Sequence, residues 1–141
     1  MTLVVDASVV VKWLLIDPTR EAETTHAERL MAWALESRER IVQPAHWLIE
    51  VGAVLARLSP STAVDDIAML AALELPTEEG PAILERACRL AIDLRQHLFD
   101  TLYHAVALET TDATLVTADL RYLAAGALVG RIVRLTDWEP T

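Results

Sequence analysis

The sequence has a single cysteine, few glycines and a single lysine, and it has no long apolar run. One cysteine, Cys88, cannot form an internal disulfide or a zinc cluster. It lies in a helical pattern, so we expect it to pack in the core as a small hydrophobic side chain. No apolar segment approaches the roughly 20 residues that span a bilayer, and the first residues lack the pattern of a signal peptide. We therefore expect a cytoplasmic protein that makes no membrane contact.

Positive charge is scarce as well. The chain has 12 Lys and Arg against 21 Asp and Glu, which gives a formal net charge of −9. This balance argues against a protein that binds nucleic acid over a broad basic face. A cluster of carboxylates that holds divalent cations would weaken that objection, because the ions add positive charge where a substrate binds. All basic residues except Lys12 are arginines, which suit planar contacts with phosphates or with the carboxylates of a partner.

The length and the apolar pattern indicate one domain. At 141 residues and 53% hydrophobic, the chain suits a single core, and no repeat or long linker divides it, so we expect one domain over residues 1–141. The periodicity predicts a helix-rich α/β fold with a small, mostly parallel β-sheet flanked by helices. The predicted strands are Thr2–Val5, Ile41–Gln43, Leu115–Thr117 and Ile132–Leu135, and the predicted helices are Ala7–Ile16, Arg20–Arg40, Pro44–Leu58, Thr62–Leu73, 81–97, Asp100–Glu109 and Asp119–Ala125, with a polar junction at 77–80.

Three aspartates each precede a predicted helix: Asp6, Asp100 and Asp119. Asp6 and Asp119 also come directly after an apolar strand, which places them near the carboxyl ends of the strands. Open α/β sheets bind their ligands at that edge. An aspartate before a helix commonly caps the free N–H groups of the first turn, and for each residue alone this structural role is the alternative.

Glu50 is the only charged residue between Ile41 and Ala56. It falls on or beside the apolar stripe of its predicted helix. A buried carboxylate without a partner is costly, so it should either bind a proton or face a cation. The alternatives are a glutamate that reaches solvent or one that pairs with Arg57.

If these four carboxylates converge, their repulsion raises some of their pKa values unless a divalent metal compensates. Mg²⁺ or Mn²⁺ fits a ligand set made only of oxygen atoms. Such ions activate a bound water and stabilise a leaving oxygen, which favours phosphodiester hydrolysis. Ser8 and Thr117 can place hydroxyl groups at the same edge, or they can serve as local caps. Lys12 can pair with the acidic site, touch a phosphate or extend to solvent.

Four segments, in this order and spacing, resemble the PIN-domain nucleases, and among them the VapC-type toxins of type II toxin–antitoxin systems. The segments are VVDASVVVKWL at 4–14, WLIEVGAVL at 47–55, FDTLYHAVAL at 99–108 and LVTAD at 115–119. The resemblance implies a PIN-like fold, a metal-binding quartet of Asp6, Glu50, Asp100 and Asp119, and accompanying hydroxyls at Ser8 and Thr117.

The resemblance also implies Mg²⁺ or Mn²⁺ as cofactor, RNA as substrate, a cognate antitoxin protein as partner and a homodimer. Many of these toxins carry an asparagine one turn after the glutamate, where this sequence has Ala53. Candidates for a basic rim that contacts RNA are Lys12, Arg57, Arg86, Arg89 and Arg121.

Other features suggest structural roles or contact surfaces. The four histidines do not form a paired metal-ligand motif. Trp13, Trp33 and Trp47 lie in apolar helical patterns that favour packing, and Trp138, near the polar C-terminus, is the least constrained tryptophan. The chain has a mean hydropathy of +0.31, and Met69, Leu70 and Leu73 form an apolar stripe. Together they suggest apolar surface for dimer or antitoxin contacts.

Two hypotheses compete with an endoribonuclease. The first is a catalytically weak or inactive PIN-fold module that binds RNA or a protein without turnover, and the complete quartet argues against it. The second is an acidic-site phosphatase of the haloacid dehalogenase kind. That class expects a second aspartate two residues after its nucleophile, where this sequence has Ser8 after Asp6.

Overall fold

A computed structural model describes residues 1–15 and 23–141. The central sheet has three parallel strands in the order β1 (Thr2–Val5), β4 (Ala113–Thr117) and β5 (Ile132–Arg134). A single bridge from Leu3 to Ile41 extends it beyond β1. A second parallel pair joins β2 (Gln43–Pro44) to β3 (Thr77–Glu78). The α/β class with a small parallel sheet, predicted from the sequence, is confirmed.

The central strands are buried on both faces. Leu3, Val4 and Val5 of β1 and Leu115 and Val116 of β4 have no exposed side-chain surface. Strands covered by helices on both sides are continuous apolar runs rather than alternating ones, as here. This burial fixes the register, in which Val5 lies opposite Val116 and both strands end at the same edge.

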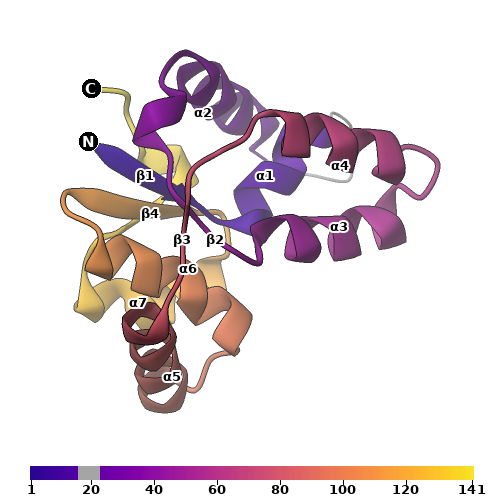
Figure 1. The fold of residues 1–141 in the computed structure, drawn as a ribbon. Helices are drawn as coiled ribbons and strands as arrows, with labels where there is room; N and C mark the ends of the chain where they lie inside the picture. Colours follow the sequence, from indigo (N-terminus) through magenta and orange to yellow (C-terminus); the bar gives the residue numbers. More distant parts are fainter. Residues whose placement is uncertain (16–22) are drawn as a thin grey trace.

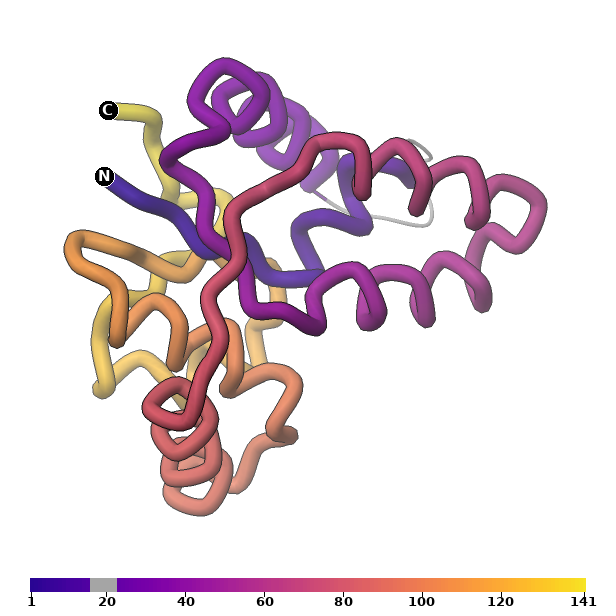
Figure 2. Tube along the Cα trace, viewed as in Figure 1, coloured from indigo at the N-terminus to yellow at the C-terminus, as the bar shows by residue number. Residues whose placement is uncertain are grey.

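The helices surround this sheet in two groups (Figure 1). They are α1 (Ala7–Leu14), α2 (Thr24–Glu36), α3 (Trp47–Leu58), α4 (Ala63–Ala72), α5 (Pro81–Leu94), α6 (Leu98–Glu109) and α7 (Leu120–Gly126). Helix α6 packs on β1, β2 and β4, while α1 contacts α2, α3 and β4. Helices α3 and α4 form a hairpin that projects from the sheet, and Figure 2 shows the chain crossing back from α4 to α5 beside β2.

The start of α6 differs from the prediction. Helix α5 ends at Leu94 because Arg95 adopts a left-handed conformation, with φ of 53°. His97 then caps α6, and its Nδ1 accepts the N–H of Phe99 at 3.1 Å. The helix therefore begins at Leu98, and Asp100 lies inside the first turn rather than before it. The prediction of one helix to residue 97 and another from Asp100 was wrong at this junction.

The region from 41 to 47 also differs. Pro44 was expected to open a helix, but it lies in β2 opposite Glu78, and α3 begins at Trp47. Residues 77–80 were expected to form only a polar junction, but Thr77 and Glu78 form strand β3. The pairing follows from tertiary contact, because the N–H of Gln43 donates to the carbonyl of Pro76 at 2.9 Å.

The first two helices are shorter than expected. Helix α1 ends at Leu14, and the predicted end at Ile16 lies outside the described residues. Within the predicted helix from Arg20 to Arg40, α2 covers Thr24–Glu36 and a 3₁₀ turn covers Arg38–Arg40, while residues 20–22 lie outside the described part.

Two expectations about packing were wrong. Cys88 is exposed, because the buried stripe of α5 is formed by Ile83, Ala87 and Leu90 and leaves the next position toward solvent. Trp138 is buried, with 4% of its surface exposed, and its ring meets that of Trp33 edge-on at 5.7 Å. Within residues 1–15 and 23–141, no helix has the length and apolar content to cross a membrane.

Candidate active site

The site lies where β1 and β4 end. Asp6 follows β1 directly and caps α1, and Asp119 follows β4 after one intervening residue and caps α7. Because the two strands are parallel neighbours, their ends bring these aspartates to one edge of the sheet. Helix α3 adds Glu50 from its first turn, and α6 adds Asp100 from its first turn.

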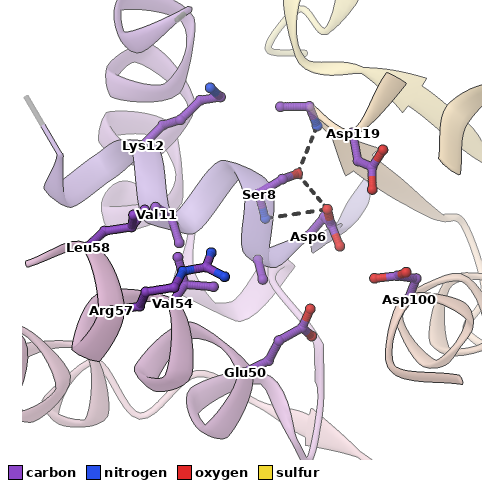
Figure 3. A pocket seen from close by; sticks show the side chains of 12 residues that line it. Asp6, Ser8, Val11, Lys12, Glu50, Val54, Arg57, Leu58, Asp100 and Asp119 are labelled. Atoms are coloured by element: carbon purple, nitrogen blue, oxygen red, sulfur yellow. Dashed lines mark hydrogen bonds between the residues drawn. The ribbon is translucent and has the colours of Figure 1, made fainter. Parts of the chain in front are cut away.

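These four carboxylates line one pocket of about 300 Å³. Figure 3 shows them pointing into a shared space, with Ser8 beside Asp6 and with Lys12 and Arg57 on the side of α1 and α3. The pocket brings together all four acidic residues singled out in the sequence. Ser8 also lines it, whereas Thr117 lies beneath, with 1% of its surface exposed.

Asp6 is held by two hydroxyl groups. Oγ of Ser8 donates to Oδ2 of Asp6 at 2.5 Å, and Oγ1 of Thr117 donates to the same oxygen at 3.1 Å. The backbone N–H groups of Ala118 and Asp119 donate to these hydroxyls, each at 3.0 Å. The bonds converge on Oδ2, which leaves Oδ1 of Asp6 toward the pocket (Figure 3).

Asp119 both caps a helix and lines the pocket. Its Oδ1 accepts the backbone N–H of Tyr122 at 3.1 Å. Capping occupies one oxygen of the carboxylate, so the second oxygen can serve another ligand. Capping, the structural alternative considered for each aspartate, is therefore present at Asp6 and Asp119 and is compatible with a role in the pocket.

Glu50 lies beside a histidine rather than beside Arg57. Its Oε2 lies 3.2 Å from Nε2 of His46, one turn earlier on the chain. That nitrogen lies 3.0 Å from the carbonyl of Phe99, and a carbonyl can only accept, so Nε2 carries a hydrogen that points there. Oε2 of Glu50 consequently stays buried without a hydrogen-bond partner.

The electrostatics of the pocket are unfavourable in the absence of a cation. Burial raises the pKa of Asp6 to about 6, and the carboxylates of Glu50 and Asp100 oppose its ionisation further, against the stabilising bonds from Ser8 and Thr117. Burial also raises the pKa of Asp100, with added repulsion from Glu50 and Asp119. Two carboxylates that resist ionisation in one pocket are what an uncompensated acidic cluster produces.

The donor set fits a hard divalent cation. All four side chains supply oxygen, and one of those oxygens is buried without a hydrogen bond. Among the residues that the structure describes, no three His, Cys, Asp or Glu side chains are already close enough to hold an ion directly. Mg²⁺ commonly binds through one or two carboxylates and keeps several waters, and the pocket has room for such a hydrated ion.

The expected basic rim is only partly at the pocket. Lys12 and Arg57 line it, and Arg89 and Arg121 are not among the lining residues. Arg86 instead pairs with Glu109, at 3.0 Å. Positive charge at the pocket therefore comes from α1 and α3. These two helices contact each other, and they also supply apolar lining residues such as Val11 and Val54.

Gln43 supports the site and was missed by the sequence reasoning. Its side-chain amide donates to the carbonyl of Val5 and accepts the N–H of Val5, both at 2.8 Å. The side chain thus makes the two hydrogen bonds to Val5 that the backbone of a neighbouring strand would make. Val5 is the last residue of β1 and directly precedes Asp6. A glutamine in a short apolar strand was the available signal, because a fully buried amide must be hydrogen-bonded.

The structure is thus that of an α/β domain with an acidic pocket at the carboxyl ends of its parallel strands. The family model for the PIN domain matches residues 3–128. The match covers most of the sequence, and the chain belongs to the PIN domain family. PIN domains are generally metal-dependent nucleases that act on RNA or DNA. A comparison with curated proteins found no match.

Proposed function

We propose that this protein is a metal-dependent endoribonuclease that hydrolyses RNA phosphodiester bonds in the acidic pocket. The observation that carries the proposal is the meeting of Asp6, Glu50, Asp100 and Asp119, from four separate elements, in one pocket. The raised pKa values of Asp6 and Asp100 support it, because such a cluster needs a cation to be ionised at neutral pH.

In the proposed reaction the four carboxylates would hold Mg²⁺, or Mn²⁺ in its place, directly or through water. When bound, the ion would supply a water of lowered pKa and positive charge for the leaving oxygen. Ser8 and Thr117 fix Asp6 through Oδ2, and the capped end of α7 fixes Asp119 through Oδ1. The free oxygens of both aspartates thereby keep one direction, which electrostatic catalysis requires.

The substrate phosphate would meet the few basic groups at the pocket. Lys12 and Arg57 line the same space as the carboxylates, so they suit the phosphates on either side of the cleaved bond. The net charge of −9 repels RNA elsewhere on the molecule. Binding should therefore be local and should depend on the ion.

We further propose that the protein is the toxin of a VapBC-type toxin–antitoxin pair, acts in the cytoplasm as a homodimer and consists of one domain. Exposed apolar side chains on the α3–α4 hairpin support a partner surface. Ile49 is 73% exposed, Val64 81% and Met69 44%, whereas Leu70 is fully buried. Of the expected stripe, Met69 is exposed, Leu73 is half-buried and Leu70 is buried, so only Met69 is fully open to a partner.

One observation favours the alternative of a weak or inactive module. No three potential ligands in the described residues are preassembled around an ion, and Ala53 supplies no polar side chain next to Glu50. In that case the protein would bind RNA or an antitoxin without turnover.

The test is cleavage of total cellular RNA by purified protein in Mg²⁺ or Mn²⁺, against the same mixture with EDTA. The matched variants are Asp6→Asn and Asp112→Asn, the second at an exposed turn where φ is 56° and asparagine is well tolerated. We expect wild type and Asp112→Asn to cut, and Asp6→Asn and EDTA to abolish cutting. Intact RNA with folded wild-type protein would support the inactive module instead.

A further inference from the structure

Tyr103 is a buried tyrosine next to the acidic pocket whose hydroxyl has no hydrogen-bond partner. It lies on α6, one turn after Asp100, so the same face of the helix carries both side chains toward α3. Its ring is fully buried and packs against the ring of His46, with 5.0 Å between the centroids. A phenol usually finds a partner when it is buried, so this unpaired hydroxyl needs a physical explanation.

The hydroxyl faces carboxylates. Burial raises the pKa of Tyr103 far above its ordinary value, and the nearby carboxylate of Glu50, followed by those of Asp6 and Asp100, raises it further. Geometry places the two residues together as well, because the ring of Tyr103 packs on that of His46, whose Nε2 lies 3.2 Å from Oε2 of Glu50. A phenol carries a hydrogen that it can donate.

The acceptor that it faces is also unpaired. Oε2 of Glu50 is buried without a hydrogen-bond partner. The N–H of His46 points to the carbonyl of Phe99, so the histidine beside Oε2 does not satisfy it. A buried donor and a buried acceptor beside the pocket are thus each without a partner, and a hydrogen bond between them would satisfy both.

We propose that Tyr103 is a positioning residue of the pocket: its hydroxyl donates to Oε2 of Glu50 and leaves Oε1 to face the divalent ion. The inference rests on the proposed function, since it assigns to Glu50 a place at the metal. Carboxylates that bind metals are themselves held by hydrogen bonds, and loss of such a bond commonly weakens metal affinity by about 10- to 100-fold. Tyr103 contacts neither the ion nor the substrate, and it acts through Glu50.

Tyr103→Phe removes only the hydroxyl, and Tyr122→Phe is the matched control. Tyr122 is the other tyrosine and is also buried, but its hydroxyl bonds with Nδ1 of His104 at 3.0 Å. We expect Tyr103→Phe to keep or raise the melting temperature without metal, because an unpaired polar group disappears. We expect its Mn²⁺ dissociation constant, measured by calorimetry, to rise about ten-fold. Tyr122→Phe should melt earlier and bind Mn²⁺ as wild type does.

The outcomes separate the inference from the proposed function. Wild-type protein that binds no Mn²⁺ overturns both. Wild-type protein that binds Mn²⁺ while Tyr103→Phe binds it equally well overturns only the role of Tyr103. Proton NMR of the metal-free protein gives a second test: a slowly exchanging tyrosine hydroxyl proton that persists in Tyr122→Phe should be present and should shift in Glu50→Gln. A spectrum without such a proton contradicts the proposal.

Discussion

At the scale of single residues, the raised pKa of Asp6 makes the metal-free protein sensitive to pH. The carboxyl has a pKa of about 6 in the folded state, against an ordinary value of 3.8, so the folded protein holds its proton where the unfolded chain has lost it. The protonated carboxyl contributes to stability in full below about pH 4. As the pH rises through 6, this contribution is lost and the free energy of unfolding falls by about 3 kcal/mol.

This sign predicts that Asp6→Asn stabilises the protein in EDTA at pH 7. The neutral amide resembles the protonated acid and keeps an oxygen that accepts from Ser8 and Thr117. Urea unfolding of both proteins at pH 4.5 and pH 7 measures the effect, with a clearly larger gain over wild type expected at pH 7 than at pH 4.5. A variant less stable than wild type at pH 7 would show that Asp6 is ionised without difficulty and needs no cation.

A second residue-scale prediction concerns Gln43. Gln43→Leu keeps the volume but leaves the N–H and the carbonyl of Val5 unpaired inside the protein. We expect the free energy of unfolding to fall by about 2–4 kcal/mol. Gln96→Leu is the control, because Gln96 is only half-buried and bonds locally to the carbonyl of Leu94. Equal urea midpoints for the two variants would rule out a special role for the buried amide.

At the scale of elements, the break between α5 and α6 places Asp100. Arg95 holds a left-handed conformation that favours glycine, so Arg95→Gly should stabilise the protein by about 0.5–1 kcal/mol. Arg89→Gly, at an exposed position in the middle of α5, should destabilise it by about 1 kcal/mol. Thermal unfolding compares them, and a loss of stability in Arg95→Gly would mean that the arginine side chain itself holds the junction.

The elements also explain what could be predicted from the sequence. Asp6 and Asp119 follow apolar strands, so their meeting at one edge of a parallel sheet follows from local pattern and topology. Glu50 was conspicuous as a lone charge in an apolar helix. The capping of α6 by His97, by contrast, was hidden by the periodicity that continues across the junction.

Contacts between distant segments could not be predicted from the sequence, because they depend on tertiary structure. The bond of Gln43 to Val5 depends on how β2 meets β1, and the contact of His46 with the carbonyl of Phe99 depends on how the start of α3 meets α6. Tyr103 has the spacing of an ordinary core aromatic, and only the fold places its hydroxyl beside a carboxylate. Local patterns thus placed the acids, and the groups that orient them needed tertiary structure.

At the scale of the whole molecule, the net charge of −9 makes RNA binding depend on the divalent ion. Removal of the ion leaves an acidic pocket on an acidic protein, and RNA affinity should fall by about ten-fold or more. Fluorescence anisotropy of a labelled RNA in Ca²⁺ or in EDTA, at one ionic strength, measures this. Equal affinities in both buffers would indicate an RNA surface elsewhere on the protein.

We expect a divalent ion to bind among the four carboxylates, and a titration of Mn²⁺ into isotope-labelled protein examines this binding. The paramagnetic ion broadens NMR signals of amides near its site. Substoichiometric Mn²⁺ should broaden first the amides of Asp6, Glu50, Asp100 and Asp119, and Asp6→Asn should remove this pattern. Broadening spread over the acidic surface, with no preference for these four residues, would contradict it.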